Sequence, residues 1–152
     1  MRTFGRLIAT TAVAVALTTA ALGTPAHAGG GRWVERHAMY KATNVSRDRF
    51  GRYNVAINRT MSKVALKHSR WMARNDALDH TSDPAAAYLK GIGWHCWGEN
   101  IAVSGGTIGD VEKAFMASPE HRANILNSCF KHIAIGATRV DGTLWVTVFF
   151  YG

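Results

Sequence analysis

Residues 97–126 read WGENIAVSGGTIGDVEKAFMASPEHRANIL, and this stretch decides the fold. Residues 94–103, which overlap the start of this stretch, have the composition of a strand. Thr107 followed by Asp110 resembles a capping box, and the apolar residues after it recur on one helical face. Pro119, with Ser118 as its cap, is typical of the start of a further helix. The stretch therefore predicts a strand followed by two helices.

Helical patterns precede this stretch. Residues 60–74 are the clearest helix, because their apolar side chains recur at the spacing of one buried face. Residues 32–50 are compatible with an amphipathic helix, and residues 85–89 with a helical turn after a polar loop. The face expected to be buried in the clearest helix carries Met61, Val64, Ala65, His68, Trp71 and Met72. We also expect Trp71, Trp94, Trp97 and Trp145 to lie in the core.

The C-terminal end predicts a β-hairpin. Apolar residues alternate from Ile133 to Ala137, and residues 144–151 are rich in β-branched and aromatic side chains. The pair Asp141-Gly142 between them favours a tight turn. Helices first, a strand between them and a hairpin last predict an α+β layered fold.

The first 28 residues have the layout of a secretory signal peptide. Two arginines precede an apolar run that ends near Leu22, and residues 26–28 have the A-x-A pattern of a cleavage site. We therefore expect a mature chain that starts near Gly29 and is secreted. An uncleaved membrane anchor is the alternative, which the Ala-rich and Thr-containing composition disfavours.

Removal of the signal peptide leaves 124 of the 152 residues, a size that suits one domain. We assign residues 29–37 to an N-terminal linker and residues 38–152 to the domain. No later run is apolar enough to cross a bilayer, so a soluble, extracellular and monomeric protein is expected.

The mature chain is basic. The totals are 18 Lys plus Arg against 10 Asp plus Glu, and the signal peptide removes two Arg and no acid, which leaves a net charge of +6. This charge favours anionic surroundings. The basic residues are scattered and no aromatic-flanked nucleic-acid motif occurs among them. We expect an acidic cell-wall polymer or a lipid as partner, rather than DNA or RNA.

The chain has two cysteines, Cys96 and Cys129. An even count in an exported chain predicts one disulfide between them. Two free thiols are the alternative.

Three polar side chains are candidates for a site. Glu99 stands among apolar residues of the predicted strand, where a carboxylate is costly to bury unless it is paired or bound to a metal. A structural glutamate bonded to the backbone is equally compatible. His80 lies in a polar loop and His121 in the first turn of the helix that begins at Pro119, so both could direct an imidazole into a shared cleft. Their spacing alone carries no metal-ligand signature.

Other residues and motifs of the sequence do not point to a site. His68 lies on the apolar face of its helix, where an imidazole bonded to a backbone carbonyl is expected, so it is left out. The G-x-S-x-G, H-E-x-x-H, P-loop and G-x-G-x-x-G motifs are absent from the sequence, which lowers the expectation of a common hydrolase or nucleotide enzyme.

Five short motifs occur in order along residues 38–151. They are residues 44–47, the A-x-x-H-S-x-x-M-A pattern at 65–73, HTS at 80–82, GENIA at 98–102 and SPEHRANIL at 118–126. Together they resemble the bacterial branch of the CAP superfamily, which comprises cysteine-rich secretory, antigen 5 and pathogenesis-related 1 proteins.

This resemblance implies a three-layer α-β-α sandwich with helices on both sides of a mainly antiparallel sheet. It also implies a cleft that gathers His80, Glu99 and His121, matching the family's first cleft histidine, its GEN glutamate and its HRANIL histidine. Ser118 stands near the position at which eukaryotic members of the family carry a second cleft glutamate. A Cys96–Cys129 bridge would tie the GEN strand to the segment after HRANIL.

Three functions are compatible with these features. The first is a non-enzymatic extracellular binding or effector module, in which His80, Glu99 and His121 hold a divalent cation such as zinc and the ligand is a lipid or a wall component. The second is an acid–base or metal-assisted hydrolase, peptidase-like, with Ser82 as a conceivable nucleophile. The third is a cationic protein that adheres to anionic cell surfaces. The first is favoured, and catalysis is not expected.

Overall fold

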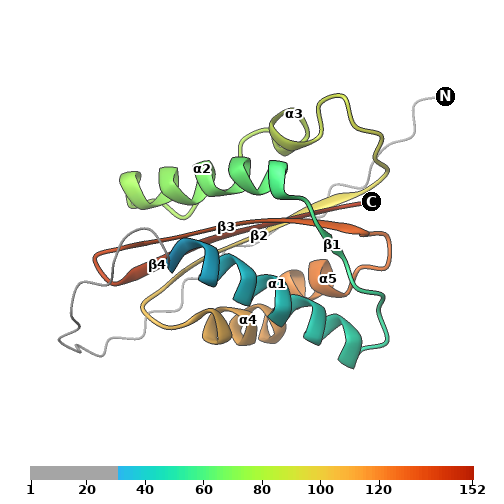
Figure 1. Ribbon diagram of the computed structural model, residues 1–152, viewed down its shortest axis with the longest axis horizontal. Helices are drawn as coiled ribbons and strands as arrows, with labels where there is room; N and C mark the ends of the chain where they lie inside the picture. Colours follow the sequence, from blue (N-terminus) through green and yellow to red (C-terminus); the bar gives the residue numbers. More distant parts are fainter. Residues whose placement is uncertain (1–30) are drawn as a thin grey trace.

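The computed structural model describes residues 31–152, and the predicted signal peptide lies outside them. In chain order the elements are α1 (Gly31–Arg49), β1 (Ala56–Ile57), α2 (Arg59–Asn75), α3 (Pro84–Tyr88), β2 (Trp97–Ser104), α4 (Ile108–Ala117), α5 (Pro119–Leu126), β3 (His132–Val140) and β4 (Thr143–Tyr151). Helices α2 and α3 cover one face of the sheet, and α1, α4 and α5 cover the other (Figure 1). Within this part of the chain, no helix is both long and apolar enough to cross a bilayer.

The sheet has four strands in the order β1-β3-β4-β2. Strands β3 and β4 form the predicted hairpin, which turns at Asp141 and Gly142 with both residues at positive φ. Strand β2 pairs with β4 antiparallel, and only the two-residue β1 runs parallel, beside β3. The expectation of an α-β-α sandwich with a mainly antiparallel sheet is confirmed, and β2 forms one of its edges.

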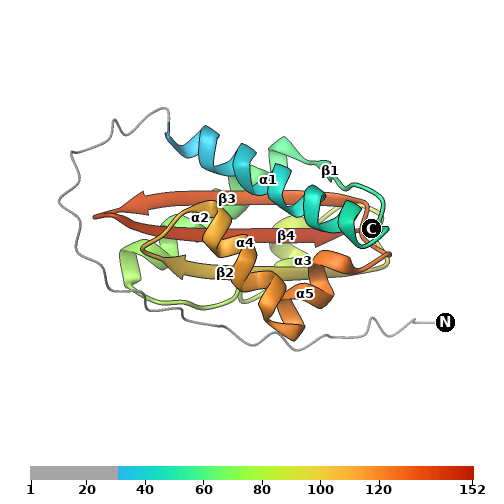
Figure 2. The same cartoon turned by 90° about the horizontal axis from the view of Figure 1, so that it is seen from below.

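Both faces of the hairpin are buried, because successive side chains alternate between the two helical layers. Ile133, Ile135, Val148 and Phe150 pack with residues of α1, α4 and α5. Their neighbours Ala134, Phe149 and Tyr151 pack with α2 and α3. Figure 2 shows α1, α4 and α5 lying together across the first of these faces.

The buried face of α2 is rotated relative to the sequence prediction. Met61, Ala65 and Met72 are buried as expected, but Ser62 and Ser69 join them, while Trp71 is 40% exposed. The hydroxyls explain the difference, because each has a partner in the core. Ser62 Oγ accepts from Ile135 N at 3.1 Å, and Ser69 Oγ lies 2.9 Å from Thr147 Oγ1. The expectation that Trp71 lies in the core is wrong.

The helix predicted over residues 32–50 is α1, which begins one residue earlier, at Gly31. Residues 31–37, which the predicted domain division placed in a linker, are part of this helix. The capping box of Thr107 and Asp110 is present at α4, as predicted. Ser118 precedes α5 but makes no side-chain capping bond to it.

Glu112 of α4 places a carboxyl group between α4 and α1. Its Oε2 accepts from the Thr43 hydroxyl at 3.3 Å, and its Oε1 has no partner among the described residues. Burial raises the pKa of Glu112, and its polar contacts with Ser46 and Thr43 offset only part of that effect. The folded state therefore binds the Glu112 proton more tightly than the unfolded state does. This contribution to stability weakens as pH rises through and above the ordinary pKa of 4.5.

We expect Glu112→Gln to be more stable than the wild type near neutral pH, because the amide keeps the hydrogen bonds without a charge to desolvate. The gain should shrink toward about pH 4, where the wild-type carboxyl group is protonated in both states. Urea unfolding of both proteins between about pH 4 and about pH 8 measures the difference. A difference that does not change with pH would show that Glu112 does not couple folding to protonation.

Candidate functional site

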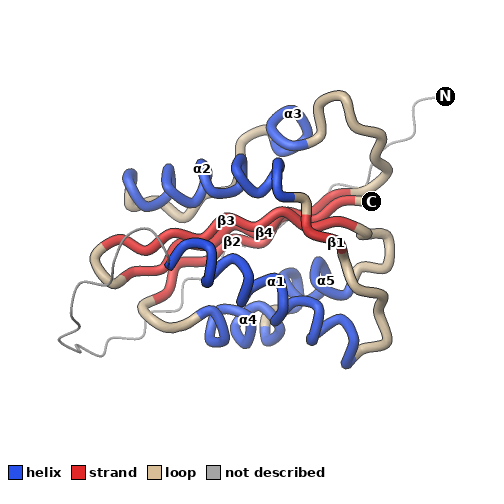
Figure 3. Tube along the Cα trace, viewed as in Figure 1, coloured by secondary structure: helices blue, strands red, loops and turns tan. Residues whose placement is uncertain are grey.

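Strand β2 supplies one polar side chain to each helical layer. Glu99 lies opposite Phe149 of β4 and so faces α2 and α3, whereas Asn100 lies opposite Val148 and faces α5. This alternation follows from the pleat of the strand. The loop between α2 and α3, drawn in tan in Figure 3, passes on the Glu99 side.

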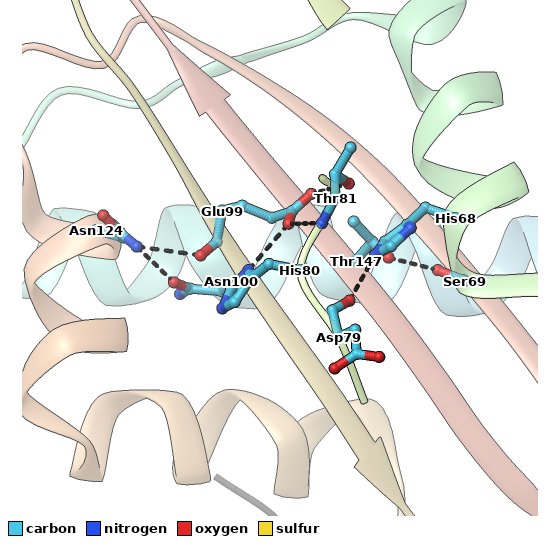
Figure 4. Close-up of polar contacts among 9 residues, drawn as sticks. All are labelled: His68, Ser69, Asp79, His80, Thr81, Glu99, Asn100, Asn124 and Thr147. Atoms are coloured by element: carbon cyan, nitrogen blue, oxygen red, sulfur yellow. Dashed lines mark hydrogen bonds and ion pairs between the residues drawn. The ribbon is translucent and has the colours of Figure 1, made fainter. Parts of the chain in front are cut away.

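Glu99 is a buried carboxylate, 1% exposed, with three donors. Its Oε1 lies 2.9 Å from His80 Nδ1 and accepts from the backbone N–H of Thr81 at 2.9 Å, and its Oε2 accepts from the Thr81 hydroxyl at 2.7 Å (Figure 4). Burial raises the pKa of Glu99, but the hydrogen bonds from His80 and Thr81 outweigh it and hold the pKa below its ordinary value. Glu99 is therefore ionised at neutral pH.

His80 is held by this carboxylate through one ring nitrogen. Since an ionised Glu99 can only accept, the hydrogen lies on Nδ1 of His80. The other nitrogen, Nε2, is buried and has no hydrogen-bond partner among the described residues. In the neutral imidazole, Nε2 then carries a free lone pair.

His121 lies in the first turn of α5 and is 1% exposed. Its ring packs 4.9 Å from that of Phe115, between centroids, and neither ring nitrogen has a partner within residues 31–152. Burial lowers the pKa of His121, and the charge of His80 lowers it further, against an opposing effect of Glu120. His121 is thus neutral at neutral pH. The structure brings His80 and Glu99 into direct contact, whereas the ring of His121, on α5, makes no hydrogen bond to either of them.

A pair of buried asparagines fixes α5 to β2. Asn124 Nδ2 donates to Asn100 Oδ1 at 2.8 Å and to the Glu99 carbonyl at 3.3 Å, and Asn100 Nδ2 donates to the His121 carbonyl at 3.0 Å. A side chain on Gly98 would collide with Asn124, so glycine is needed there for the close approach. This network sets the position of His121 relative to Glu99.

Three further residues lie beside the site without having been predicted to belong to it. Thr81 supplies two of the three hydrogen-bond donors to Glu99. The only feature of the sequence that could have pointed to Thr81 is that a buried carboxylate needs such donors nearby. His68 Nε2 lies 2.8 Å from the Asp79 carbonyl, which confirms the expected backbone bond, but its ring is only half-buried and stacks on Trp71. The Tyr88 hydroxyl is buried beside Thr81 without a well-formed hydrogen bond.

The structure gives no support to Ser82 as a nucleophile. Ser82 is exposed, and the Nε2 atom of His80 makes no hydrogen bond to it. Across residues 31–152, no three His, Cys, Asp or Glu side chains are arranged to hold a metal ion. Both Glu99 carboxylate oxygens already accept hydrogen bonds. The atoms of the site that remain free to coordinate a metal are therefore imidazole nitrogens.

A disulfide joins Cys96 to Cys129, as predicted, with 33 residues between them in sequence. It connects the residue before β2 to the segment between α5 and β3. The bridge and the asparagine pair therefore hold β2 and α5 together at two points.

Comparison with known proteins places this fold among described ones. A sequence profile of the cysteine-rich secretory protein family, CAP, matches residues 40–150. The uncharacterized protein YkwD of Bacillus subtilis (strain 168) is 34% identical in an alignment 116 residues long, and the match covers 73% of this chain and 45% of YkwD. The chain thus spans less than half of that relative.

Solved structures share the architecture. An extracellular protein with an SCP domain from Bacillus anthracis superposes with a TM-score of 0.68 at 25% identity, over 79% of this chain and 41% of that protein. The protein NaASP2, crystallised with Zn²⁺, superposes with a TM-score of 0.62 at 12% identity, over 84% of this chain and 83% of its own. The second likeness shows a shared fold alone.

Proposed function

The chain belongs to the cysteine-rich secretory protein family, CAP, and on that premise we propose that it is an exported, non-enzymatic binding module whose cleft takes a divalent cation such as zinc. One observation carries the proposal. Three buried imidazole nitrogens, Nε2 of His80 and both ring nitrogens of His121, have no hydrogen-bond partner among the described residues. Since buried polar atoms in proteins are nearly always bonded, such atoms point to a ligand.

Neutral imidazole nitrogens are ligands that zinc accepts. His121 is neutral because burial lowers its pKa. Glu99 accepts the Nδ1 hydrogen of His80, which orients the ring and increases the basicity of Nε2, as carboxylates behind zinc-bound histidines do. A bound zinc ion would supply a positive centre for an oxygen atom of a ligand. Direct ligation by Glu99, the third residue predicted, would require it to give up hydrogen bonds to Thr81.

Export is supported by the signal-peptide pattern and by the disulfide, since such bonds persist in oxidising compartments. The similar SCP-domain protein of Bacillus anthracis is likewise an extracellular protein. A lipid-like molecule or a wall component is the ligand class proposed for the cleft.

We expect the mature domain to bind zinc and His121→Leu to lose that binding. Because the imidazole nitrogens of His121 have no hydrogen-bond partner in the described part of the chain, leucine should fill the position without loss of stability in the absence of zinc. Glu99→Gln should weaken zinc binding by about 10- to 100-fold, because the partner of His80 changes. Calorimetric titration with zinc, together with urea unfolding of each variant, measures both properties.

His95→Ala is the matched control, because His95 is exposed and is not one of the residues proposed to hold the metal. It should bind zinc as the wild type does. Absence of saturable binding by the wild type, or equal binding by His121→Leu, would contradict the metal site.

A hydrolase is the second candidate, favoured by one feature. The Nδ1–H of His80 donates to Glu99, and its Nε2 has no hydrogen-bond partner within residues 31–152, so His80 is arranged as a general base oriented by a carboxylate. Turnover of peptide or ester substrates by the wild type and its loss in Glu99→Gln would support this candidate over a binding module.

A further inference from the structure

Arg47, in the last turn of α1, carries a buried guanidinium group that is 1% exposed. It donates only to backbone carbonyls: Nε to Tyr53 at 2.8 Å, Nη1 to Ile125 at 2.7 Å and to Asn127 at 3.0 Å, and Nη2 to Phe130 at 3.3 Å. Since a guanidinium has five N–H groups, one on Nη2 remains available.

No carboxylate compensates the charge of Arg47. The ion pairs found within residues 31–152 are His80–Glu99 and Arg139–Glu35, and residues 1–30 contain no acidic residue. Burial lowers the pKa of Arg47, and the nearby charge of Arg52 lowers it further. A buried charge without a counter-charge is costly, so an anion that reached it would be bound favourably.

A pocket of about 230 Å³ opens beside this group. Arg52 and Lys131 add two exposed cations to its wall, and Asn54, Ser128 and Tyr53 add polar groups. No acidic side chain lines it. The pocket lies where the end of α1 meets the segment between α5 and β3. These two segments lie near the right-hand side of Figure 2. His80, Glu99 and His121, the residues of the proposed metal site, are not among the residues that line it.

We propose that this pocket is a binding site for a phosphate group. A pocket lined by positive charges concentrates anions, and arginine and lysine are the side chains that hold phosphate oxygens. Three positive charges around one small pocket favour a phosphate over a singly charged carboxylate. At about 30 Å³ per water, the pocket has room for about eight water volumes, which is enough for a phosphate group and too little for a folded polymer.

The group could arrive as free phosphate or as one unit of a phosphodiester polymer, and both present the same oxygens. In either case the pocket gives the basic mature chain, with its net charge of +6, one defined site of contact with an anion. This site is separate from the proposed zinc site. Phosphate binding and zinc binding can therefore succeed or fail independently.

The test uses the mature domain at constant ionic strength, titrated with inorganic phosphate, with a short glycerol-phosphate oligomer and with acetate. Two-dimensional NMR follows the Nε–H resonance of Arg47. We expect saturable binding of at least one phosphate probe with a shift of this resonance. Because Arg47→Gln would remove four structural hydrogen bonds and endanger folding, the variant is Arg52→Gln/Lys131→Gln, at two exposed residues. Its affinity should fall by about tenfold or more, as expected for the loss of two charged contacts.

Lys67→Gln/Arg74→Gln on α2 is the matched control, since it removes the same charge from exposed positions far from the pocket. It should keep the wild-type affinity. Tighter binding of inorganic phosphate would identify the free ion as the source, and tighter binding of the oligomer would identify a phosphodiester. Equal weakening in both double variants, acetate binding as tight as phosphate, or no binding of either phosphate probe would overturn the proposal.

Discussion

The Gly136→Ala variant is expected to lose about 3 kcal/mol or more of its free energy of unfolding, at the upper end of the cost of overpacking a core. Gly136 lies on β3 where α2 crosses the sheet. A Cβ atom there would fall within 3.0 Å of the Ala65 carbonyl and of Leu66 N. Both are backbone groups of a helix, so a side-chain rotation cannot relieve the clash. Helix α2 would have to move away from the strand it packs against.

Urea unfolding at neutral pH measures the loss, and Gly93→Ala is the control. Gly93 has open space around its Cα atom and no positive φ, so alanine there should leave stability nearly unchanged or raise it slightly. If Gly136→Ala were as stable as Gly93→Ala, the close approach of α2 to β3 would be wrong.

The close packing of α2 against β3 also explains why the apolar pattern did not predict the whole buried face of α2. Periodicity located α2 within one residue at each end, but a stripe of apolar residues could not reveal that two serines face the core. Ser62 and Ser69 are small enough for close packing and bond to Ile135 and Thr147, which lie more than seventy positions later. A hydroxyl that finds its partner only in the folded chain has no local signal.

The sheet likewise has parts that local sequence predicts and parts that it does not. The hairpin of β3 and β4 was predictable, because Asp141-Gly142 and the flanking alternation act locally. The two-residue β1 was missed, since its pairing with His132 and Ile133 is too short to leave a pattern. The two-layer cover of the sheet came from the family resemblance and not from periodicity.

The site was predictable as far as single residues and motifs allow. Glu99 was suspect because its carboxylate lies among apolar residues, and the structure gives it three hydrogen bonds from His80 and Thr81. Thr81 and the Asn100–Asn124 pair were not assigned roles, because their partners depend on how loop, strand and helix meet. Metal binding by His80, Glu99 and His121 stays a prediction.

The second large effect is expected from the disulfide. Cys96→Ser/Cys129→Ser should lose about 3–4 kcal/mol of unfolding free energy, the value that chain entropy assigns to a closed loop of this length. The two sulfur atoms are 33 residues apart in sequence, and the loop between them contains β2, α4 and α5. Opening it frees the unfolded chain without removing any core residue of the folded one.

Urea unfolding of the oxidised wild type, the reduced wild type and the double variant measures this effect, and the last two should agree. Zinc affinity serves as the local readout. Asn124 still joins α5 to β2 in the variant, so affinity should be retained wherever the variant is folded. Loss of zinc affinity in a folded variant would assign the geometry of the cleft to the disulfide instead of the asparagine pair. Unchanged stability would mean that the unfolded chain already holds residues 96–129 in a compact state, so the bridge constrains nothing that folding must still order.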